Sequence, residues 1–170
     1  PINTKSNVKI LGYGMDITII DAEESHRVLN IVENNNIYIS SLTLTGGLAN
    51  IEAENNNLGG AIYIDESNPF LTDLIIINNN AHDGGGMFLI NSNPTMTDIT
   101  VIDNIANNRG GGIFLSESNP ILTGLNVVAN SAEEDGGGMF LINSNPSMTD
   151  VTISLNSALD DGGGMRQSYS

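Results

Sequence analysis

The stretch that decides the fold is GGGMFLINSNPTMTDIT, Gly84 to Thr100, because the chain repeats it almost unchanged as GGGMFLINSNPSMTDVT, Gly136 to Thr152. Weaker copies of the same unit begin at Gly59, Gly110 and Gly162, so successive units start 25 or 26 residues apart. Each unit reads Gly-Gly-Gly or Gly-Gly-Ala, three apolar residues, Ser-Asn-Pro, an apolar residue with Thr, an alternating segment and Asn-x-Ala. Self-similarity at a fixed period of this length is typical of repeat proteins.

The unit is too strongly punctuated by Gly and Pro to hold a long helix, and its alternating segments are rich in β-branched residues. Such a unit cannot bury its own apolar face, so we expect copies to stack with equivalent strands parallel and about 4.8 Å apart. The sequence therefore predicts an all-β protein, a right-handed parallel β-helix. Alternation places these pairs inward: Leu74 and Ile76, Ile99 and Val101, Leu125 and Val127, and Val151 and Ile153.

One domain is expected over residues 1–170, with about six to seven coils. Residues 59–170 form regular repeats whose last coil is incomplete, whereas residues 1–58 read as irregular coils with Leu42 and Leu44 in inward positions. Residues 50–58 are predicted to form a protruding loop. Both ends of the sequence look cut from a longer chain.

The composition narrows the classes of partner. Twenty acidic residues against five basic ones give a net charge of −15, which argues against nucleic acid and against anionic membrane surfaces. No apolar run approaches a transmembrane span, so no membrane insertion is expected. The absence of cysteine excludes a disulfide, a thiolate nucleophile and a zinc-thiolate site. The acidic charge suits a surface that collects cations, and the absence of cysteine is compatible with a prokaryotic extracellular protein.

Four aromatic residues share one position of the unit, a column that Arg166 continues: Tyr63, Phe88, Phe114 and Phe140. If the neighbouring Met87 and Leu89 point inward, the column points outward and forms an exposed apolar stripe suited to sugars or to another protein chain. The opposite register would place the rings in the core. We expect the outward register and an interaction stripe.

Acidic residues gather at two positions. Asp73, Asp98 and Asp150 share a column in which Gly124 takes the missing place, and Asp135 and Asp161 directly precede Gly corners. Carboxylates on adjacent coils repel one another unless they are protonated or bridged by a cation. These five residues are therefore candidate calcium ligands, and the alternative is a solvated acidic rim.

The remaining columns have structural interpretations. The Gly triplets precede strands rather than helices, so they predict tight corners and not a phosphate cradle. The Asn of each Ser-Asn-Pro favours a turn and can hydrogen-bond along its column. A Thr column, formed by Thr72, Thr97, Thr123 and Thr149, would suit ice binding on a flat outer face, but hydrogen bonding within turns explains it as well.

The segments GGAIYI (Gly59–Ile64) and ISLNSA (Ile153–Ala158) resemble the Gly-Gly-Ala-Ile and aromatic-x-x-Asn-x-Ala motifs of the chlamydial polymorphic outer-membrane protein repeats. The resemblance covers roughly Leu42 to Met165. It implies the β-helix fold, a cell-surface or secreted location and an adhesive or passenger role. The chain departs from the family because Ile77, Ile102, Val128 and Ser154 replace the aromatic of the second motif.

The architecture also resembles pectate lyases and polygalacturonases, which suggests a polysaccharide-binding or polysaccharide-degrading domain as the alternative. Asp73 and Asp98 are the nearest pair of carboxylates for a hydrolase. The regularity of the repeat argues against catalysis, because an active site interrupts a repeat. The sequence therefore predicts a non-catalytic structural or adhesion module without a required cofactor. Its expected partners are other protein copies or surface proteins, joined end to end or laterally, and carbohydrate.

Overall fold

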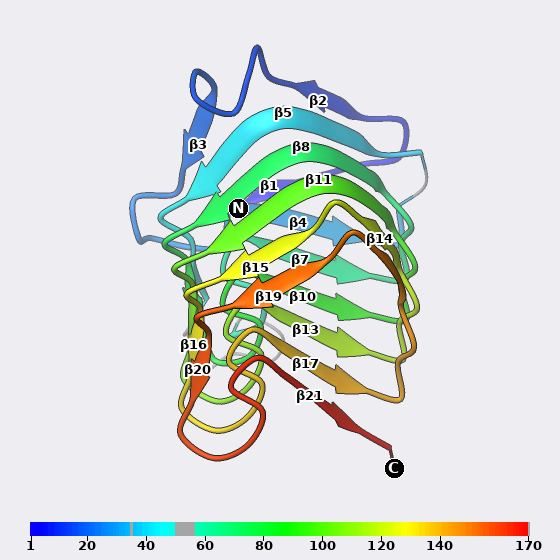
Figure 1. The fold of residues 1–170 in the computed structure, drawn as a ribbon. Helices are drawn as coiled ribbons and strands as arrows, with labels where there is room; N and C mark the ends of the chain where they lie inside the picture. The colour runs from blue at the N-terminus through cyan, green and yellow to red at the C-terminus, as the bar shows by residue number, and fades with distance from the viewer. Residues whose placement is uncertain (35, 50–56, 170) are drawn as a thin grey trace.

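The computed structural model describes residues 1–34, 36–49 and 57–169, and over these residues the chain forms strands and no helix. The strands build three parallel sheets of seven, nine and five strands. The chain visits the sheets in turn, making a β-solenoid of about six turns whose N-terminal and C-terminal coils lie at opposite ends of the stack (Figure 1). The all-β parallel β-helix predicted from the repeat is confirmed.

Each regular coil contributes one strand, or one divided strand, to each sheet. Sheet A contains β1 (Ile2–Asn3), β4 (Leu29–Val32), β7 (Ile62–Asp65), β10 (Met87–Ile90), β13 (Ile113–Ser116), β17 (Met139–Ile142) and β21 (Met165–Ser168). Sheet B contains β2 (Lys9–Leu11), β3 (Ile19–Asp21), β5 (Tyr38–Thr45), β8 (Phe70–Ile77), β11 (Thr95–Ile102), β14 (Ile121–Thr123), β15 (Asn126–Val128), β18 (Ser147–Thr149) and β19 (Thr152–Ser154). Sheet C contains β6 (Leu48–Ala49), β9 (Asn80–Ala81), β12 (Ile105–Ala106), β16 (Ser131–Ala132) and β20 (Ser157–Ala158).

The register stacks equivalent positions of the repeat directly on one another. In sheet A, Phe88 pairs with Tyr63 on one side and with Phe114 on the other. In sheet B, Thr97 lies between Thr72 and Thr123. A shift by one residue would reverse every inward side chain, so the apolar alternation fixes this register.

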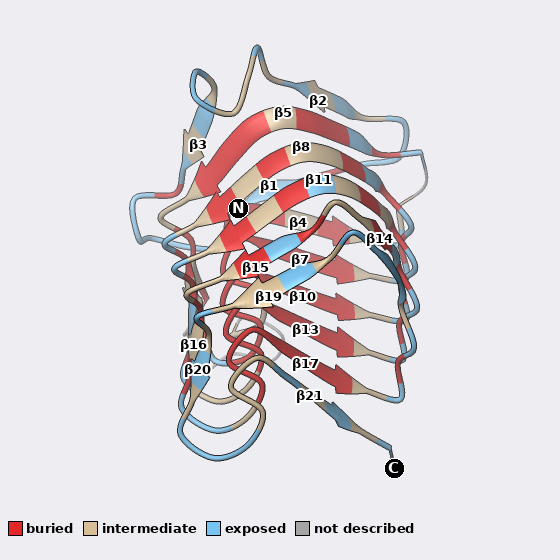
Figure 2. Ribbon diagram, viewed as in Figure 1, coloured by how far each residue is buried: buried red, intermediate tan, exposed pale blue. Residues whose placement is uncertain are grey.

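The main core fills the space between the three sheets. The inward pairs predicted on β8, β11 and the β14–β15 segment are buried, as are Leu42 and Leu44 on β5. Val151 and Ile153 pack against the same core but are only partly buried, since no described coil lies beyond them. Figure 2 shows this change along the stack, from mostly buried residues on β10, β13 and β17 to exposed and intermediate residues on β19 and β21.

Left-handed residues turn the chain at fixed positions of each coil. The first glycine of each Gly-rich motif, from Gly59 to Gly162, has a φ between 63° and 68°. Gly84, for example, is followed after two residues by β10 and not by a helix. The interpretation of these motifs as tight corners is confirmed, because a left-handed φ favours glycine.

Two asparagine ladders run along the stack. The expected ladder of the Ser-Asn-Pro turns is present: the backbone N–H groups of Asn93, Asn119 and Asn145 donate to the Oδ1 of the preceding Asn at 2.6, 2.6 and 2.7 Å. A second ladder was not predicted as such and lies at the corner between sheets B and C, where Asn79, Asn104 and Asn130 are buried. Asn79 donates through both its backbone N–H and its Nδ2 to Asn104 Oδ1 at 3.0 and 2.9 Å, and Asn104 does the same to Asn130.

The N-terminal coils include a loop that packs on sheet B. Residues 12–18 leave β2 as a loop that contacts β5: Gly12 N–H donates to Ser40 O at 2.8 Å, and Thr43 Oγ1 donates to Met15 O at 2.7 Å. The predicted protruding loop at 50–58 lies mostly outside the described residues. No helix long and apolar enough to cross a membrane occurs in the part of the chain that the structure describes.

Candidate functional site

The aromatic column lies on the outer face of sheet A, but it is not exposed. Tyr63, Phe88, Phe114 and Phe140 point away from the main core, as alternation predicts, and form a second apolar cluster with partly buried neighbours such as Leu58 and Ile90. Their exposed fractions are only 2 to 6%. The expectation of an exposed interaction stripe is therefore wrong. Alternation gives the face on which a side chain lies, and it does not show what covers that face.

The rings stack along the solenoid axis. Ring centroids are 5.9 Å apart between Tyr63 and Phe88, 4.7 Å between Phe88 and Phe114, and 5.0 Å between Phe114 and Phe140. The connections from sheet C to sheet A curl back beside the strands of sheet A (Figure 1). The Arg109 guanidinium, from one of these connections, lies 5.6 Å from the Phe114 ring and 5.0 Å from the Phe140 ring. The loops and their cation thus cover a second, aromatic core.

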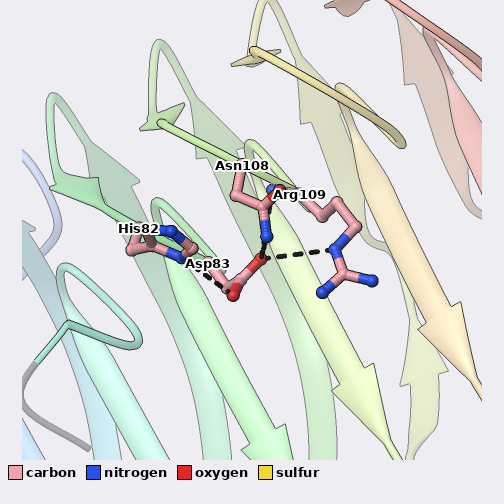
Figure 3. Close-up of polar contacts among 4 residues, drawn as sticks. All are labelled: His82, Asp83, Asn108 and Arg109. Atoms are coloured by element: carbon pink, nitrogen blue, oxygen red, sulfur yellow. Dashed lines mark hydrogen bonds and ion pairs between the residues drawn. The ribbon is translucent and has the colours of Figure 1, made fainter.

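Asp83 forms the main polar contacts of the loops that cover the aromatic column. Its Oδ1 accepts hydrogen bonds from Asn108 Nδ2 at 2.9 Å and from the Arg109 backbone N–H at 3.1 Å, and it lies 3.7 Å from Arg109 Nε. Its Oδ2 lies 3.1 Å from His82 Nδ1 (Figure 3). Asp83 is buried, and these contacts tie two adjacent loops together. The carboxylate therefore has a sufficient structural role, since a buried charge needs such partners.

Phe114→Ala is expected to lower the free energy of unfolding by about 3 kcal/mol, because it removes a buried ring from the middle of the stack and leaves a cavity beneath Arg109. Urea unfolding followed by far-UV circular dichroism measures the change. Phe70→Ala is the matched control, since Phe70 on β8 is 52% exposed and should cost under about 1 kcal/mol. Equal losses for the two variants would contradict the second core.

The N-terminal end of the aromatic stack carries a cation of its own. Arg27 lies 4.8 Å from the Tyr63 ring centroid, and its Nε donates to the carbonyls of Leu58 and Gly59 at 3.0 and 3.1 Å. Burial lowers the pKa of Arg27 to about 10, which still leaves the guanidinium charged at neutral pH. Burial, together with the charge of Asp65, raises the pKa of the Tyr63 hydroxyl to about 12, and that hydroxyl donates to Asp65 Oδ2 at 3.1 Å.

Tyr63 should therefore ionise late in an alkaline titration. An unfolded tyrosine has a pKa of about 10, so the unfolded state loses this proton first and the contribution of Tyr63 to stability falls between pH 10 and about 12. The depressed pKa of Arg27 acts in the opposite direction above pH 10, so an optical titration isolates Tyr63 better than an unfolding curve does. The phenolate absorbance of the native protein should rise near pH 12, and Tyr63→Phe should remove that rise. A rise that survives in this variant would contradict the assignment.

The Asp73, Asp98 and Asp150 column has a conformational explanation. These residues have φ values of 50°, 51° and 52°, and Gly124, which takes the missing place, has 63°. They form the bend in the middle of each sheet B strand, and Asp tolerates the left-handed region better than most residues. The Asp98 carboxylate lies over Gly124, at the place where a Cβ would sit. The column is thus a left-handed bend, which Ser41 with a φ of 58° continues on β5.

Asp135 and Asp161 share a different cation. Arg166 follows Phe140 in the aromatic column, and its Nη1 binds Asp135 Oδ1 at 2.7 Å and also contacts Asp161. The described residues contain no group of three or more His, Cys, Asp or Glu side chains arranged to hold a metal ion. The structure therefore does not bring the five candidate calcium ligands into one site, and calcium binding stays a prediction.

Open depressions occur at the corner between sheets B and C. One is lined by Asp21, Glu23, Glu24, Thr45, Gly46 and Asn78, and its neighbour by Glu24, Asn78, Asn79, Asn80, Asp103 and Ile105. Neither contains a His, Lys, Arg or Tyr that could serve as a base or acid beside the carboxylates. Asp73 and Asp98, the candidate pair for hydrolysis, line neither depression.

Sequence reasoning missed the most exposed aromatic on the sheet surfaces. Phe70 starts β8 and lies in register with Tyr38, Thr95 and, one coil further, Ile121. Phe70 and Ile121 are 52% and 53% exposed. Only Tyr38 and Phe70 are aromatic in this column, so the repeat gave no aromatic signal there. The predicted Thr column lies beside it on the outer face of sheet B.

No protein-family model matches this chain, and neither the curated proteins nor the solved structures contain a match to it. The parallel β-solenoid is supported by the geometry described above, whereas no family match supports the resemblance to the chlamydial repeats.

Proposed function

We propose that this chain is a non-catalytic structural module, a β-solenoid rod that acts as a scaffold at a prokaryotic cell surface. One observation carries the proposal: the two Asn columns and the Ser column of the repeat are used for bonds between coils. The inner Asn ladder, for example, repeats the same pair of hydrogen bonds at successive interfaces, from Asn79 to Asn104 and from Asn104 to Asn130.

The Ser of each Ser-Asn-Pro turn supports the same interpretation. The backbone N–H of Ser92 donates to Ser118 Oγ at 3.0 Å, and that of Ser118 donates to Ser144 Oγ at 3.0 Å. Each of these hydroxyls in turn donates to a carbonyl two residues earlier in its own coil. Buried groups that satisfy one another in this way stabilise the rod and leave few for chemistry.

The location and the partners belong to the proposal as well. The resemblance to surface-protein repeats favours an extracellular rod, and the net charge of −15 and the absence of cysteine are compatible with that location. Its partners would be other copies or surface proteins, which bind laterally or at the coil ends. We propose no required cofactor, and the hydrogen bonds that protein groups form between coils support this.

The proposal is tested by adding one coil. A second copy of residues 111–136, inserted after Gly136, repeats the unit without a break in its sequence pattern. We expect a folded protein, longer by about 4.8 Å in small-angle X-ray scattering, with a higher urea midpoint from the added interface. An insertion that unfolds the chain would overturn the view of interchangeable coils. Cleavage of polygalacturonate, xylan or β-glucan by the purified protein, with or without calcium, would overturn the non-catalytic role.

A further inference from the structure

The outer face of sheet B carries a column of hydroxyls that the structure does not use. Thr72, Thr97 and Thr123 lie in register on β8, β11 and β14 and are partly exposed. Their hydroxyls, and that of Thr95, make no hydrogen bond to another described residue. Hydrogen bonds within turns therefore do not explain this column. The β-branched shape of Thr suits a strand, but Val or Ile would supply it equally well.

Exposed apolar side chains flank these hydroxyls on the same strands. Phe70 and Ile121, at 52% and 53% exposure, stand two residues before Thr72 and Thr123, and Thr95 takes the same place before Thr97. We name this surface the β8–β14 stripe, formed by Phe70, Thr72, Thr95, Thr97, Ile121 and Thr123. Its hydroxyl column, Thr72, Thr97 and Thr123, runs along the solenoid axis, and in the neighbouring column Phe70 and Ile121 lie on either side of Thr95.

The charge around the stripe selects the class of partner. The stripe itself has no ionisable group, although the whole chain carries −15, and Asp73 and Asp98 at the adjacent bend add negative charge beside it. Polyanions are repelled here. Cationic polymers would bind elsewhere, because the loops that carry Glu133–Asp135 and Asp160–Asp161 have a higher density of acidic residues than the stripe. Symmetric contact of two copies through this face would bring their Asp columns together.

We infer that the β8–β14 stripe binds an uncharged polysaccharide that lies along the solenoid axis. Sugar rings offer apolar C–H faces for Phe70 and Ile121 and hydroxyl edges for the free Thr hydroxyls. Because the coils repeat about every 4.8 Å, an extended polymer meets a Thr hydroxyl on each of β8, β11 and β14 and an apolar side chain on β8 and β14. The inferred partner is thus a neutral glycan, which binds to the outer surface of the scaffold and not in a catalytic groove.

Native affinity electrophoresis through gels that contain mixed-linkage β-glucan, galactomannan, arabinoxylan or amylose tests this inference. We expect at least one of these polymers to retard the wild-type protein, and polygalacturonate to leave its mobility unchanged. Phe70→Ala should weaken the retardation roughly tenfold, since Phe70 is the one aromatic side chain of the stripe and a single aromatic contact can carry this much of the binding free energy. Thr97→Val, which keeps the shape and removes the hydroxyl, should weaken it by a smaller factor.

Controls match each change on another surface. Ile105→Ala removes a 46% exposed apolar side chain from sheet C, and Thr152→Val removes an exposed hydroxyl from β19, beyond the bend. Both should bind as the wild type does. Circular dichroism spectra and melting curves identify any variant that fails to fold, and Ile121→Ala then replaces Phe70→Ala as the test of the apolar column.

Three results would overturn the inference: no retardation by any of the four neutral polymers, equal losses in the stripe and control variants, or a dimer in sedimentation that Phe70→Ala dissociates. The last would assign the stripe to a second copy. The inference and the proposed scaffold role can fail separately. Shortening of a bound polymer would overturn only the non-catalytic role, and a complete lack of binding would overturn only the stripe.

Discussion

Gly111→Ala is expected to prevent the protein from folding, or to lower its free energy of unfolding by more than about 5 kcal/mol. Gly111 is the middle glycine of its corner, where three stretches of backbone meet. A Cβ at this position would lie well inside contact distance of the carbonyl oxygens of Gly137 and Ser131. Both obstacles are backbone atoms held by the pairing of adjacent coils, so neither can move without opening the stack.

The C-terminal coil provides the matched control. Gly164 is another glycine of the same motif, yet the nearest atom to its added Cβ is Ile153 Cγ2 at 3.4 Å, an ordinary contact. We expect Gly164→Ala to leave the urea midpoint almost unchanged. Circular dichroism of soluble protein, followed by urea titration, measures both variants. A folded Gly111→Ala protein with wild-type stability would show that the corners are not close-packed.

Asn104→Ala should cost roughly 3 to 5 kcal/mol, because each buried polar group left unsatisfied costs about 1 to 3 kcal/mol. Asn104 is fully buried. Its Oδ1 accepts the Asn79 backbone N–H and Nδ2, and its Nδ2 donates to the carbonyls of Ile76 and Ile102 at 2.9 and 3.0 Å. Alanine would leave several of these groups without a partner in a place that water cannot reach.

Asn93→Ala is the control for the ladder prediction. Asn93 is also one member of a repeated Asn column, and its Oδ1 accepts the Asn119 backbone N–H at 2.6 Å. Asn93 is exposed, so water can replace the lost acceptor and the cost should stay below about 1 kcal/mol. Urea midpoints of the two variants give the comparison. Similar losses would contradict the view that burial gives the inner ladder its importance.

The strands and their inward faces could be predicted from particular residues. Alternation in segments such as Ile99 to Val101 gave the buried set, and the spacing of the Gly corners gave the length of a coil. These properties are local, because a period of two residues and a left-handed corner depend on the chain itself. The stacking follows, since one coil cannot bury its own apolar side chains.

The roles of the acidic and aromatic columns could not be predicted from the repeat pattern. A column of Asp on adjacent coils has the appearance of a cation site, but the φ values of Asp73 and Asp98 identify a bend. A column of Phe opposite the core has the appearance of an exposed stripe, but Arg109 and the loops cover it. In both cases the repeat pattern predicted which residues lie in one column, but it did not predict the backbone conformation or the covering loops that explain the column.

The sequence by itself determined that this protein is a parallel β-solenoid, which side chains face its interior and where its chain turns, because periodicity and turn chemistry are written into each repeat. Only the tertiary structure decided which outward columns are covered and which are free. Loops bury Phe114 on sheet A, whereas Phe70 on sheet B stays exposed. The loops and the two strands come from different parts of each coil, and only folding decides which of them lie together. The candidate glycan surface therefore appears in the structure and not in the pattern.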